Sequence, residues 1–289
     1  MTVLDPSRPR KIPVVLLGAG NMGGAMLRGW HDADLLAPGS VVIDPHADDQ
    51  IKALCAGARL SIAATPDDAI DAADPEGIFI IAIKPQMAAK ILPRCESLAS
   101  GRGILSVMAG QSLATIAQCL SLRADAPMVR AMPNVGSAVG AGATGLFANE
   151  GVTEGDRERV TRLMTAIGAC VWVPHEADID AVTAVSGSGP AYFFLLVEAL
   201  TAAGIAEGLS PNAAATLARA TAFGVGTIIQ TDSRSAEALR QSVTSPGGTT
   251  AAALEVYERG GALRALTGAA VKAAISRAAE LNADPTTDD

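Results

Sequence analysis

The residues best suited to chemistry form one short loop, Val243 to Thr250 (VTSPGGTT), which is followed directly by the alanine-rich segment AAALEVYE. Proline fixes one dihedral, Gly247 and Gly248 allow left-handed or closely approached backbone, and Thr250 is placed to cap the helix expected next. Free amides, a helix N-terminus and several hydroxyls favour a bound carboxylate or phosphate. The loop therefore indicates a substrate site for an anion, although an ordinary capped turn between two helices has the same composition.

A second candidate site is the glycine-rich turn from Gly18 to Gly23 (GAGNMG). It follows a short apolar run with the composition of a strand buried on both faces, and it precedes a segment that can form a helix. In that context GxGxxG is typical of a dinucleotide-binding turn, with the diphosphate on the helix N-terminus. The sequence therefore predicts NAD(P)H as the cofactor.

Two residues near this turn bear on the cofactor. Asp44 ends a second short strand, 21 residues beyond Gly23, where an acid favours the 2′-hydroxyl of NADH and repels the 2′-phosphate of NADPH. A turn aspartate before Pro45 is the alternative. Lys84-Pro85 ends the apolar run 77–83 and would place an ammonium and a rigid turn beside the cofactor, unless Lys84 is simply solvated.

The elements that must position these residues alternate between strand and helix as far as Pro174. We expect strands at 13–18, 41–43, 77–83, 104–108, 144–147 and 169–173, and helices near 48–55, 87–100, 113–120 and 153–167, with a helix start at 65–68. This alternation predicts an α/β fold with a doubly wound sheet.

From His175 onward the strand signals vanish and alanine- and leucine-rich patterns take over. The expected helices are 178–185, 190–206, 211–230, 235–242, 250–259 and 262–281, with Ser210-Pro211 as an N-cap followed by proline at N1. Small residues on nearly every face permit close packing, as in an interlocked helical dimer. We therefore expect a dinucleotide-binding domain at 1–174 and an α-helical dimerisation and substrate-binding domain at 175–289.

Composition limits the class of protein. Hydrophobic residues make up 49% of the 289 residues and charged residues 18%, which predicts surfaces buried between subunits; a net charge of −8 argues against nucleic acid and anionic membranes as partners. Four dispersed cysteines without a CxxC predict no metal site. The chain begins without the apolar core of a secretory signal, and the most apolar run, 190–197, is too short for a bilayer, so a soluble cytoplasmic protein is expected.

Five stretches in the same order carry a resemblance that extends from about Val14 to Leu281. They are GAGNMG (18–23), AIKP (82–85), RAMPN (130–134), SGSGPAY (186–192) and VTSPGGTT (243–250). Together they resemble pyrroline-5-carboxylate reductases, and the last two are the most specific. The resemblance implies a Rossmann-type domain followed by an all-α dimerisation domain, and dimers that often assemble further to decamers. It also implies hydride transfer from NAD(P)H to the C=N carbon of 1-pyrroline-5-carboxylate, giving L-proline in the last step of proline synthesis.

The resemblance also implies roles for individual residues. The cofactor would contact Leu17, Gly18, Ala19, Gly20, Asn21, Met22 and Gly23, and the nicotinamide side would be lined by Ala82, Lys84, Pro85, Met108 and Ala109. The substrate carboxylate and ring nitrogen would be held by Ser245, Gly247, Gly248, Thr249 and Thr250, with Thr250 as the best candidate for a catalytic residue.

Two positions depart from the family pattern. The family commonly continues Met-Pro-Asn with Thr-Pro, whereas Val135-Gly136 stand here, so a softer or differently shaped loop is expected. Asp68 stands where the family usually has asparagine, which puts a cofactor contact there in doubt.

The residue inventory fits reduction of an imine. Reducing a ketone calls for a His or Lys acid beside the oxygen, but none of the three histidines lies in the loop, and Lys272 is the only lysine beyond Lys90. A protonated cyclic imine needs no strong acid when hydride adds. Two alternatives stay open: a β-hydroxyacid dehydrogenase that uses Lys272 as its acid, and a non-catalytic dinucleotide-binding sensor.

Overall fold

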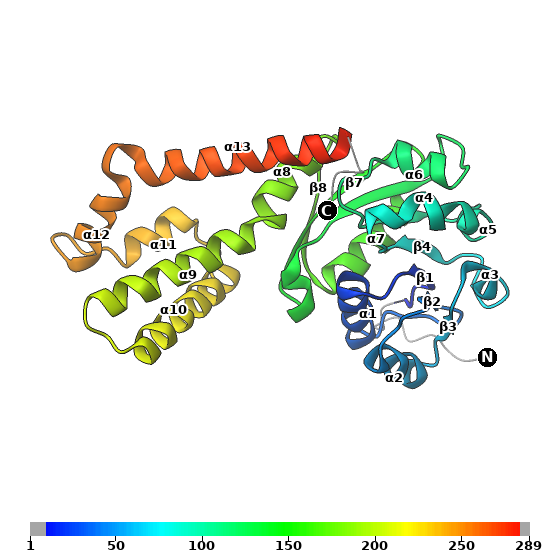
Figure 1. Cartoon of the computed structure of the whole chain (residues 1–289), viewed down its shortest axis with the longest axis horizontal. Helices are drawn as coiled ribbons and strands as arrows, with labels where there is room; N and C mark the ends of the chain where they lie inside the picture. The colour runs from blue at the N-terminus through cyan, green and yellow to red at the C-terminus, as the bar shows by residue number, and fades with distance from the viewer. Residues whose placement is uncertain (1–9, 284–289) are drawn as a thin grey trace. The chain divides into compact units, whose positions relative to one another are not determined.

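The computed structural model describes residues 10–283, which divide into two compact units (Figure 1). The first consists of the residues up to Gly187 together with those from Ala274 onward, and the second runs from Ser188 to Ala273. This division by compactness falls after the boundary expected at Pro174, because α8 (Asp178–Val182) packs on the sheet strand β7 (Gly142–Ala148). The functional boundary at 174 stays a prediction.

The first unit is built on one eight-stranded sheet in the order β3-β2-β1-β4-β5-β6-β7-β8. Its remaining strands are β1 Val14–Leu17, β2 Val41–Ile43, β3 Ser61–Ala63, β4 Ile78–Ile81, β5 Ile104–Ser106, β6 Met128–Met132 and β8 Gly168–Trp172. All neighbours pair in parallel except β6 and β7. The predicted α/β doubly wound sheet is confirmed.

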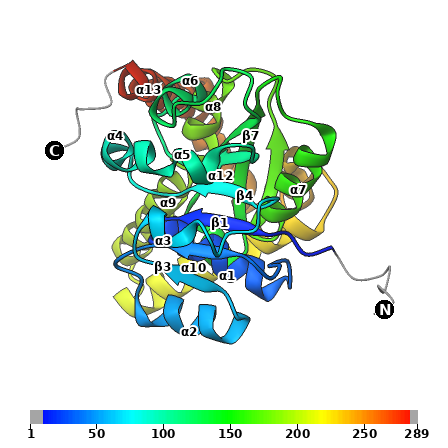
Figure 2. The ribbon, with the colours of Figure 1, turned by 90° about the vertical axis from the view of Figure 1, so that its right-hand side faces the viewer.

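Apolar side chains of the central strands cover both faces of the sheet. In β1 all four residues are buried; Val14 and Leu16 face one core cluster, whereas Val15 and Leu17 face the other. The first cluster is closed by α1 (Asn21–Asp32), α2 (Asp49–Ala58) and α7 (Glu154–Thr165), and the second by α3 (Pro66–Ala69), α4 (Ala88–Ile91), α5 (Glu96–Ala99) and α6 (Leu113–Cys119). Figure 2 shows α1 and α2 on the opposite side of β1 from α4 and α6.

Local sequence signals explain several boundaries in this unit. Thr65 and Thr153 both form capping boxes, with Asp68 and Asp156. The single helix expected at 87–100 is wrong: the segment is broken into η1 (Pro85–Met87), α4, η2 (Leu92–Cys95) and α5. Pro93 lacks the amide that a continuous helix needs. Strand β3 was not predicted, because two of its three residues are exposed and it has no buried apolar run.

The second unit is helical throughout. It contains α9 (Gly189–Ala206), α10 (Pro211–Thr231), α11 (Ala236–Ser242), α12 (Thr249–Glu258), η5 (Arg259–Gly261) and the start of α13 (Ala262–Ala283). The predicted helices are confirmed to within a few residues. Ser210 caps α10 by accepting from the Ala213 amide at 3.3 Å. Gly204 of α9 lies against Ala214 of α10, where an added Cβ would come within 3.3 Å of the alanine methyl.

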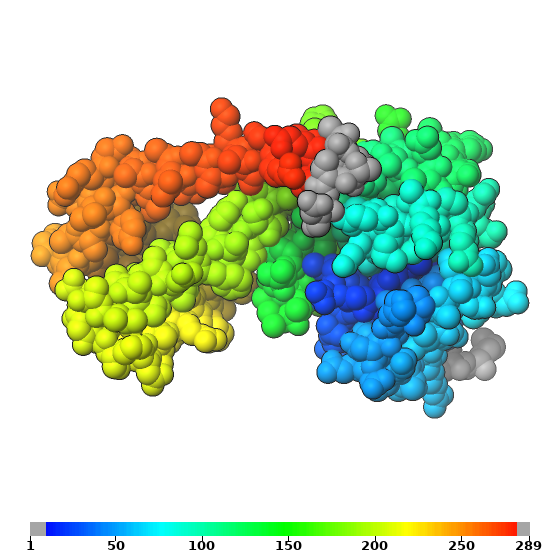
Figure 3. All heavy atoms as spheres, viewed as in Figure 1, coloured from blue at the N-terminus to red at the C-terminus, as the bar shows by residue number. Residues whose placement is uncertain are grey.

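Large apolar side chains of the second unit are exposed. Phe193, Phe194 and Leu195 on α9 are 69%, 67% and 65% exposed, and Phe223 on α10 is 78% exposed. Figure 3 shows the atoms of α9, in yellow-green, at the surface of this unit. Helices that are apolar on most faces are normally buried against other chains or in a membrane.

The helical stretch from Asp178 to Ala206 is longer than the apolar run 190–197 suggested. The π-helical turn η4 (Thr183–Gly187) joins α8 to α9. The resulting 29 residues contain an 18-residue window with a mean hydropathy of 1.5, which is long and apolar enough to cross a membrane. The apolar run 190–197 was expected to be too short to span a bilayer, but the helix that contains it is long enough, so the expectation about length is wrong. Length and composition alone do not separate a membrane span from a helix packed against another chain.

Candidate active site

The glycine-rich turn joins β1 to α1, and its three glycines have different surroundings. Gly18 has φ +91°, and an added Cβ would lie 2.8 Å from the Ala82 carbonyl oxygen. At Gly23 an added Cβ would lie 2.1 Å from the Gly18 carbonyl oxygen, so glycine lets α1 pack tightly on the turn. Gly20, in contrast, has nothing within 4 Å of its Cβ position. The space above Gly20 is therefore open to a ligand.

The N-terminus of α1 has the features that favour binding of an anion. Gly20 is the N-cap residue, and no side chain caps the helix. The first backbone amides of a helix have no partner inside it, and the helix dipole favours negative charge there. Twelve helical residues follow from Asn21. A phosphate above Gly20 would meet these amides.

A cavity of about 470 Å³ opens at the carboxyl ends of β1, β2 and β4, beside this turn. Six of the predicted cofactor residues line it: Leu17, Gly18, Gly20, Asp44, Ala82 and Lys84. Ala19, Asn21, Met22 and Gly23 belong to the turn and the first turn of α1, and Pro85 begins η1. The carboxyl edge of a parallel sheet is where such folds bind nucleotides.

Asp44 braces the glycine-rich turn from the end of β2. Its Oδ2 accepts a hydrogen bond from the Ala19 amide at 2.8 Å, and its Oδ1 accepts from the His46 amide at 2.8 Å. Each carboxylate oxygen has a second lone pair, so acceptor capacity toward the cavity is retained. Asp44 is thus both a turn residue and a lining residue, which combines the two interpretations that the sequence left open.

Sequence reasoning missed the basic residues of this cavity. His46, Lys90 and Arg94 also line it. Arg94 forms an ion pair with Asp67 at 2.7 Å, and that hydrogen bond raises the pKa of the guanidinium. Lys90 and Arg94 are four residues apart in the segment after Lys84-Pro85, so the spacing along one helical face could have signalled them.

Asp68 serves the backbone of α3. Its Oδ2 accepts from the Thr65 amide at 3.0 Å and from the Thr65 hydroxyl at 2.7 Å. Thr65 lines the cavity, whereas Asp68 is not among the lining residues. The carboxylate at this position therefore has a structural use that needs no cofactor.

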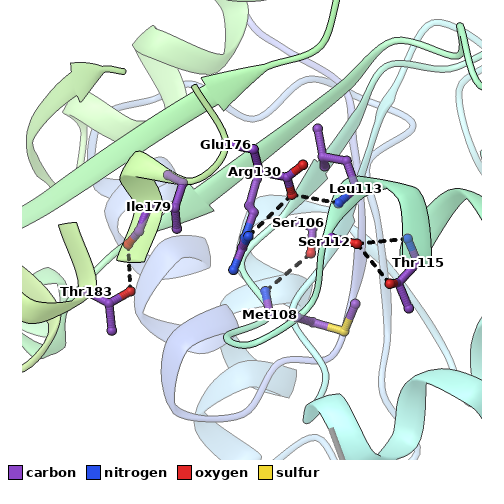
Figure 4. A network of polar contacts seen from close by, with 9 residues as sticks. All are labelled: Ser106, Met108, Ser112, Leu113, Thr115, Arg130, Glu176, Ile179 and Thr183. Atoms are coloured by element: carbon purple, nitrogen blue, oxygen red, sulfur yellow. Dashed lines mark hydrogen bonds and ion pairs between the residues drawn. The ribbon is translucent and has the colours of Figure 1, made fainter. Parts of the chain in front are cut away.

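The segment between β5 and α6 carries the other two residues expected beside the nicotinamide. The Met108 side chain is buried in the core, its amide donates to the Ser106 hydroxyl at 3.3 Å, and Ala109 is exposed (Figure 4). Neither lines the cavity beside the glycine-rich turn. Met108 could therefore contact the cofactor only through its backbone. The nicotinamide contacts expected of Met108 and Ala109 stay predictions.

Asn134 organises the loop in which the family pattern changes. Its Oδ1 accepts from the amides of Gly136 and Ala143, both at 3.1 Å, and its Nδ2 donates to the Ser186 carbonyl at 2.9 Å. Val135 is 62% exposed. The asparagine thereby joins the RAMPN stretch to the SGSGPAY stretch within the first unit.

The predicted substrate loop lies in the second unit, between α11 and α12. The Gly248 amide donates to the Ser245 carbonyl at 3.0 Å, and Gly247 has φ +72°, as a type II turn with Pro246 at its second position requires. An added Cβ at Gly248 would lie 2.5 Å from the Ser245 hydroxyl. The loop is thus tight enough that its glycines are needed.

The cap assigned to Thr250 is wrong. Gly248 is the N-cap of α12, with no side-chain hydrogen bond, and both threonines belong to the first helical turn. Ser245, Thr249 and Thr250 are exposed. A ten-residue helix without a side-chain cap leaves its first amides free, beside three hydroxyls. This arrangement can bind a carboxylate.

Residues 10–283 contain no group of three or more His, Cys, Asp or Glu side chains that could hold a metal ion. Lys272 lies on α13 and is exposed.

Comparison with known proteins supports the resemblance over about 95% of the chain. A family model described as pyrroline-5-carboxylate reductase dimerisation matches residues 176–281, and one described as NADP oxidoreductase, coenzyme F420-dependent, matches residues 13–110. The chain is 36% identical to the pyrroline-5-carboxylate reductase of Pseudomonas aeruginosa, over 95% of this chain and 97% of that protein. It is 37% identical to that of Mycobacterium tuberculosis, over 94% and 97%.

Solved structures of pyrroline-5-carboxylate reductases also match the chain over most of its length. A pyrroline-5-carboxylate reductase from Coxiella burnetii matches with a TM-score of 0.85 and 33% identity, covering 94% of this chain and 99% of that one. The Plasmodium falciparum enzyme, solved with NADP bound, matches with a TM-score of 0.76 and 25% identity, over 94% and 98%. The relatives thus match the chain over both the sheet-containing part and the helical segment, and the chain belongs to the pyrroline-5-carboxylate reductase family.

Proposed function

We propose that this protein reduces 1-pyrroline-5-carboxylate to L-proline with NAD(P)H, the last step of proline biosynthesis. The observation that carries the proposal is the exposed loop from Ser245 to Thr250, with three hydroxyls and an uncapped helix N-terminus in a chain of this family. The hydride of the reduced nicotinamide adds to the carbon of the C=N bond. The protonated imine nitrogen takes the electron pair of the π bond and becomes a neutral amine, so no strong protein acid is needed at that step.

The cofactor is assigned to the cavity beside the glycine-rich turn. Its diphosphate would lie above Gly20, on the amides at the start of α1. Lys84 and Ala82 would lie toward the nicotinamide, together with Pro85 and the β5–α6 segment. NADH is the proposed preferred cofactor, because the Asp44 carboxylate at the end of β2 would accept from a ribose 2′-hydroxyl and repel a 2′-phosphate.

The substrate carboxylate is assigned to the first amides of α12 and to the hydroxyls of Ser245 and Thr249. Gly247 and Gly248 allow the backbone to approach it. Thr250 would hydrogen-bond the ring nitrogen and help exchange its proton after reduction. Support comes from the exposure of these groups on one tight turn and the following helical turn.

A homo-oligomer accounts for the apolar surface of α9 and α10. The family model for this segment describes dimerisation, and the exposed phenylalanines of α9 offer the apolar area that a stable dimer buries. We extend this to dimers that assemble further, up to decamers, in the cytoplasm, without nucleic acid or membrane partners. The helix 178–206 would then be covered by protein and not by lipid.

The proposal is tested by oxidation of NADH and NADPH with freshly prepared 1-pyrroline-5-carboxylate, and with a panel of ketones and hydroxy acids as controls. Thr250→Ala should lower kcat by about tenfold or more, since a lost hydrogen bond to the reacting group costs on the order of 1.5–3 kcal/mol. Thr250→Ser keeps the hydroxyl and should retain most activity. Full activity of Thr250→Ala would remove the role given to Thr250, and turnover of the ketones alone would overturn the reaction.

A further inference from the structure

Glu176 lies where three separate parts of the first unit meet. Its Oε1 accepts a hydrogen bond from the Leu113 amide at 2.8 Å and receives Arg130 Nη1 at 3.3 Å (Figure 4). Leu113 begins α6, Arg130 lies in the middle of β6, and Glu176 lies two residues before α8. One carboxylate oxygen therefore links segments that are 46 and 63 residues away in the sequence.

The ion pair is protected from solvent on the arginine side. The Arg130 side chain is 6% exposed and that of Glu176 is 28% exposed. Arg130 pairs across the sheet with Ser106, the last residue of β5. A buried guanidinium beside the end of β5 holds a carboxylate firmly, because leaving either charge without its partner there is costly.

The hydrogen bond between Glu176 and the Leu113 amide fixes the end of the β5–α6 segment that enters α6. At its near end the Ser106 hydroxyl accepts from the Met108 amide at 3.3 Å, and at its far end Glu176 accepts from the Leu113 amide. Between them lie Met108 and Ala109, the residues assigned above to the nicotinamide side. Ser112 completes the start of α6 by accepting from the Thr115 amide at 3.1 Å.

We infer that Glu176 is a positioning residue for hydride transfer, which acts by holding the β5–α6 segment in place through the Leu113 amide. The inference rests on the proposed function, because it assumes that this segment faces the nicotinamide. Glu176 does not line the cofactor cavity, and its effect passes through the backbone of residues 108–113. Arg130 in turn keeps the carboxylate aimed at that amide.

The test compares Glu176→Gln with a control variant at the amino end of β5, the strand from which the β5–α6 segment leaves. The glutamine keeps an acceptor for the Leu113 amide but loses the charge that Arg130 holds. Arg102 precedes β5, and its guanidinium donates to the carbonyls of Leu98 and Asp74. Arg102→Met should therefore destabilise the same sheet at its amino edge without touching the segment.

For Glu176→Gln we expect kcat to fall about tenfold while the dissociation constant of NADH changes less than about threefold, since a small displacement of a nicotinamide-facing segment costs orientation more than binding. A deuterium isotope effect with deuterated NADH should rise, and Glu176→Asp should restore part of kcat. Arg102→Met should lower the melting temperature and leave these kinetic parameters unchanged. Equal kinetic losses in Glu176→Gln and Arg102→Met, or an unchanged kcat in Glu176→Gln, would overturn the inference.

Hydrogen exchange of the amides in 108–113 gives a readout without turnover. Glu176→Gln should speed exchange there selectively, and Arg102→Met should not. If the wild type fails to reduce the imine, the proposed function fails, whereas the exchange pattern still decides whether Glu176 holds the segment. Uniformly faster exchange over the whole unit in Glu176→Gln would mean general destabilisation and would refute the positioning role.

Discussion

Two variants of the glycine-rich turn, Gly23→Ala and Gly20→Ala, test separately how glycine lets α1 pack and how it lets the cofactor bind. At Gly23 a methyl group would lie 2.1 Å from the Gly18 carbonyl oxygen, 3.0 Å from its carbon and 3.2 Å from the Ala82 methyl. Contacts this short with backbone force α1 away from the turn. At Gly20 nothing lies within 4 Å and the backbone has φ −67°, so alanine fits the unliganded protein.

The two variants should therefore fail in different ways. Gly23→Ala should lower the free energy of unfolding by about 3 kcal/mol, the upper end of the usual cost of overpacking, because the obstacle is backbone and not a flexible side chain. Gly20→Ala should stay close to the wild type in stability. Its extended backbone suits alanine, and the entropy that alanine removes from the unfolded chain offsets its weaker preference for the N-cap position. Its methyl group would occupy the space proposed for the diphosphate, so NADH binding should weaken at least about tenfold, or about 1.4 kcal/mol.

Urea unfolding and cofactor fluorescence titration measure the two effects independently. Gly29→Ala in the middle of α1 serves as a further control, because its methyl would meet the Ile167 side chain at 2.5 Å, away from the turn. It should lose stability and keep its affinity for NADH. Unchanged NADH affinity in Gly20→Ala would refute the placement of the diphosphate, and wild-type stability of Gly23→Ala would refute the packing argument.

Three further predictions address cofactor choice, ionisation and helix propensity. Asp44→Asn keeps an acceptor for the Ala19 amide and removes the charge, so the ratio of kcat/KM with NADPH to that with NADH should rise about tenfold; an unchanged ratio would contradict the proposed role of the charge. Burial raises the pKa of the Cys95 thiol to about 12 from the ordinary 9.0, so its contribution to stability is present below pH 9 and is lost as pH rises toward 12. Denaturant unfolding from about pH 8 to pH 10 should therefore show a steeper loss in the wild type than in Cys95→Ala, and parallel curves would speak against it. Gly57→Ala in α2 meets nothing within 4 Å and should raise the free energy of unfolding by about 0.5–1 kcal/mol; a lower melting temperature would contradict this.

Local signals made much of the fold predictable. The strand before Gly18 is a buried aliphatic run, and the glycine spacing ties it to α1 through contacts only a few residues apart. The helices of the second unit begin at caps such as Ser210 and end near glycines or polar residues, so their bounds could be read from the chain. The segment 87–100 differs from the single helix that its composition predicts, because Pro93 removes a backbone amide in the middle of it.

The cofactor cavity was only partly predictable. Residues inside the fingerprint, such as Gly18 and Gly20, are specified by spacing. Lys90 and Arg94, in contrast, reach the cavity from α4 and η2, whose placement depends on packing. Glu176 was missed for the same reason, since its partners Leu113 and Arg130 lie on other elements and no short motif joins them. Contacts between distant segments are fixed by the tertiary fold and leave no local pattern.

The central claim is that hydride passes from the nicotinamide to the C=N carbon of a cyclic imino acid. It is tested most directly with NADH that carries deuterium on the transferred face of C4 and with 1-pyrroline-5-carboxylate as substrate, followed by mass spectrometry and NMR of the product. The account predicts L-proline with one deuterium at the carbon that was doubly bonded to nitrogen, formed in step with NAD⁺. Proline without deuterium, or no cofactor oxidation by folded protein that binds NADH, would contradict it.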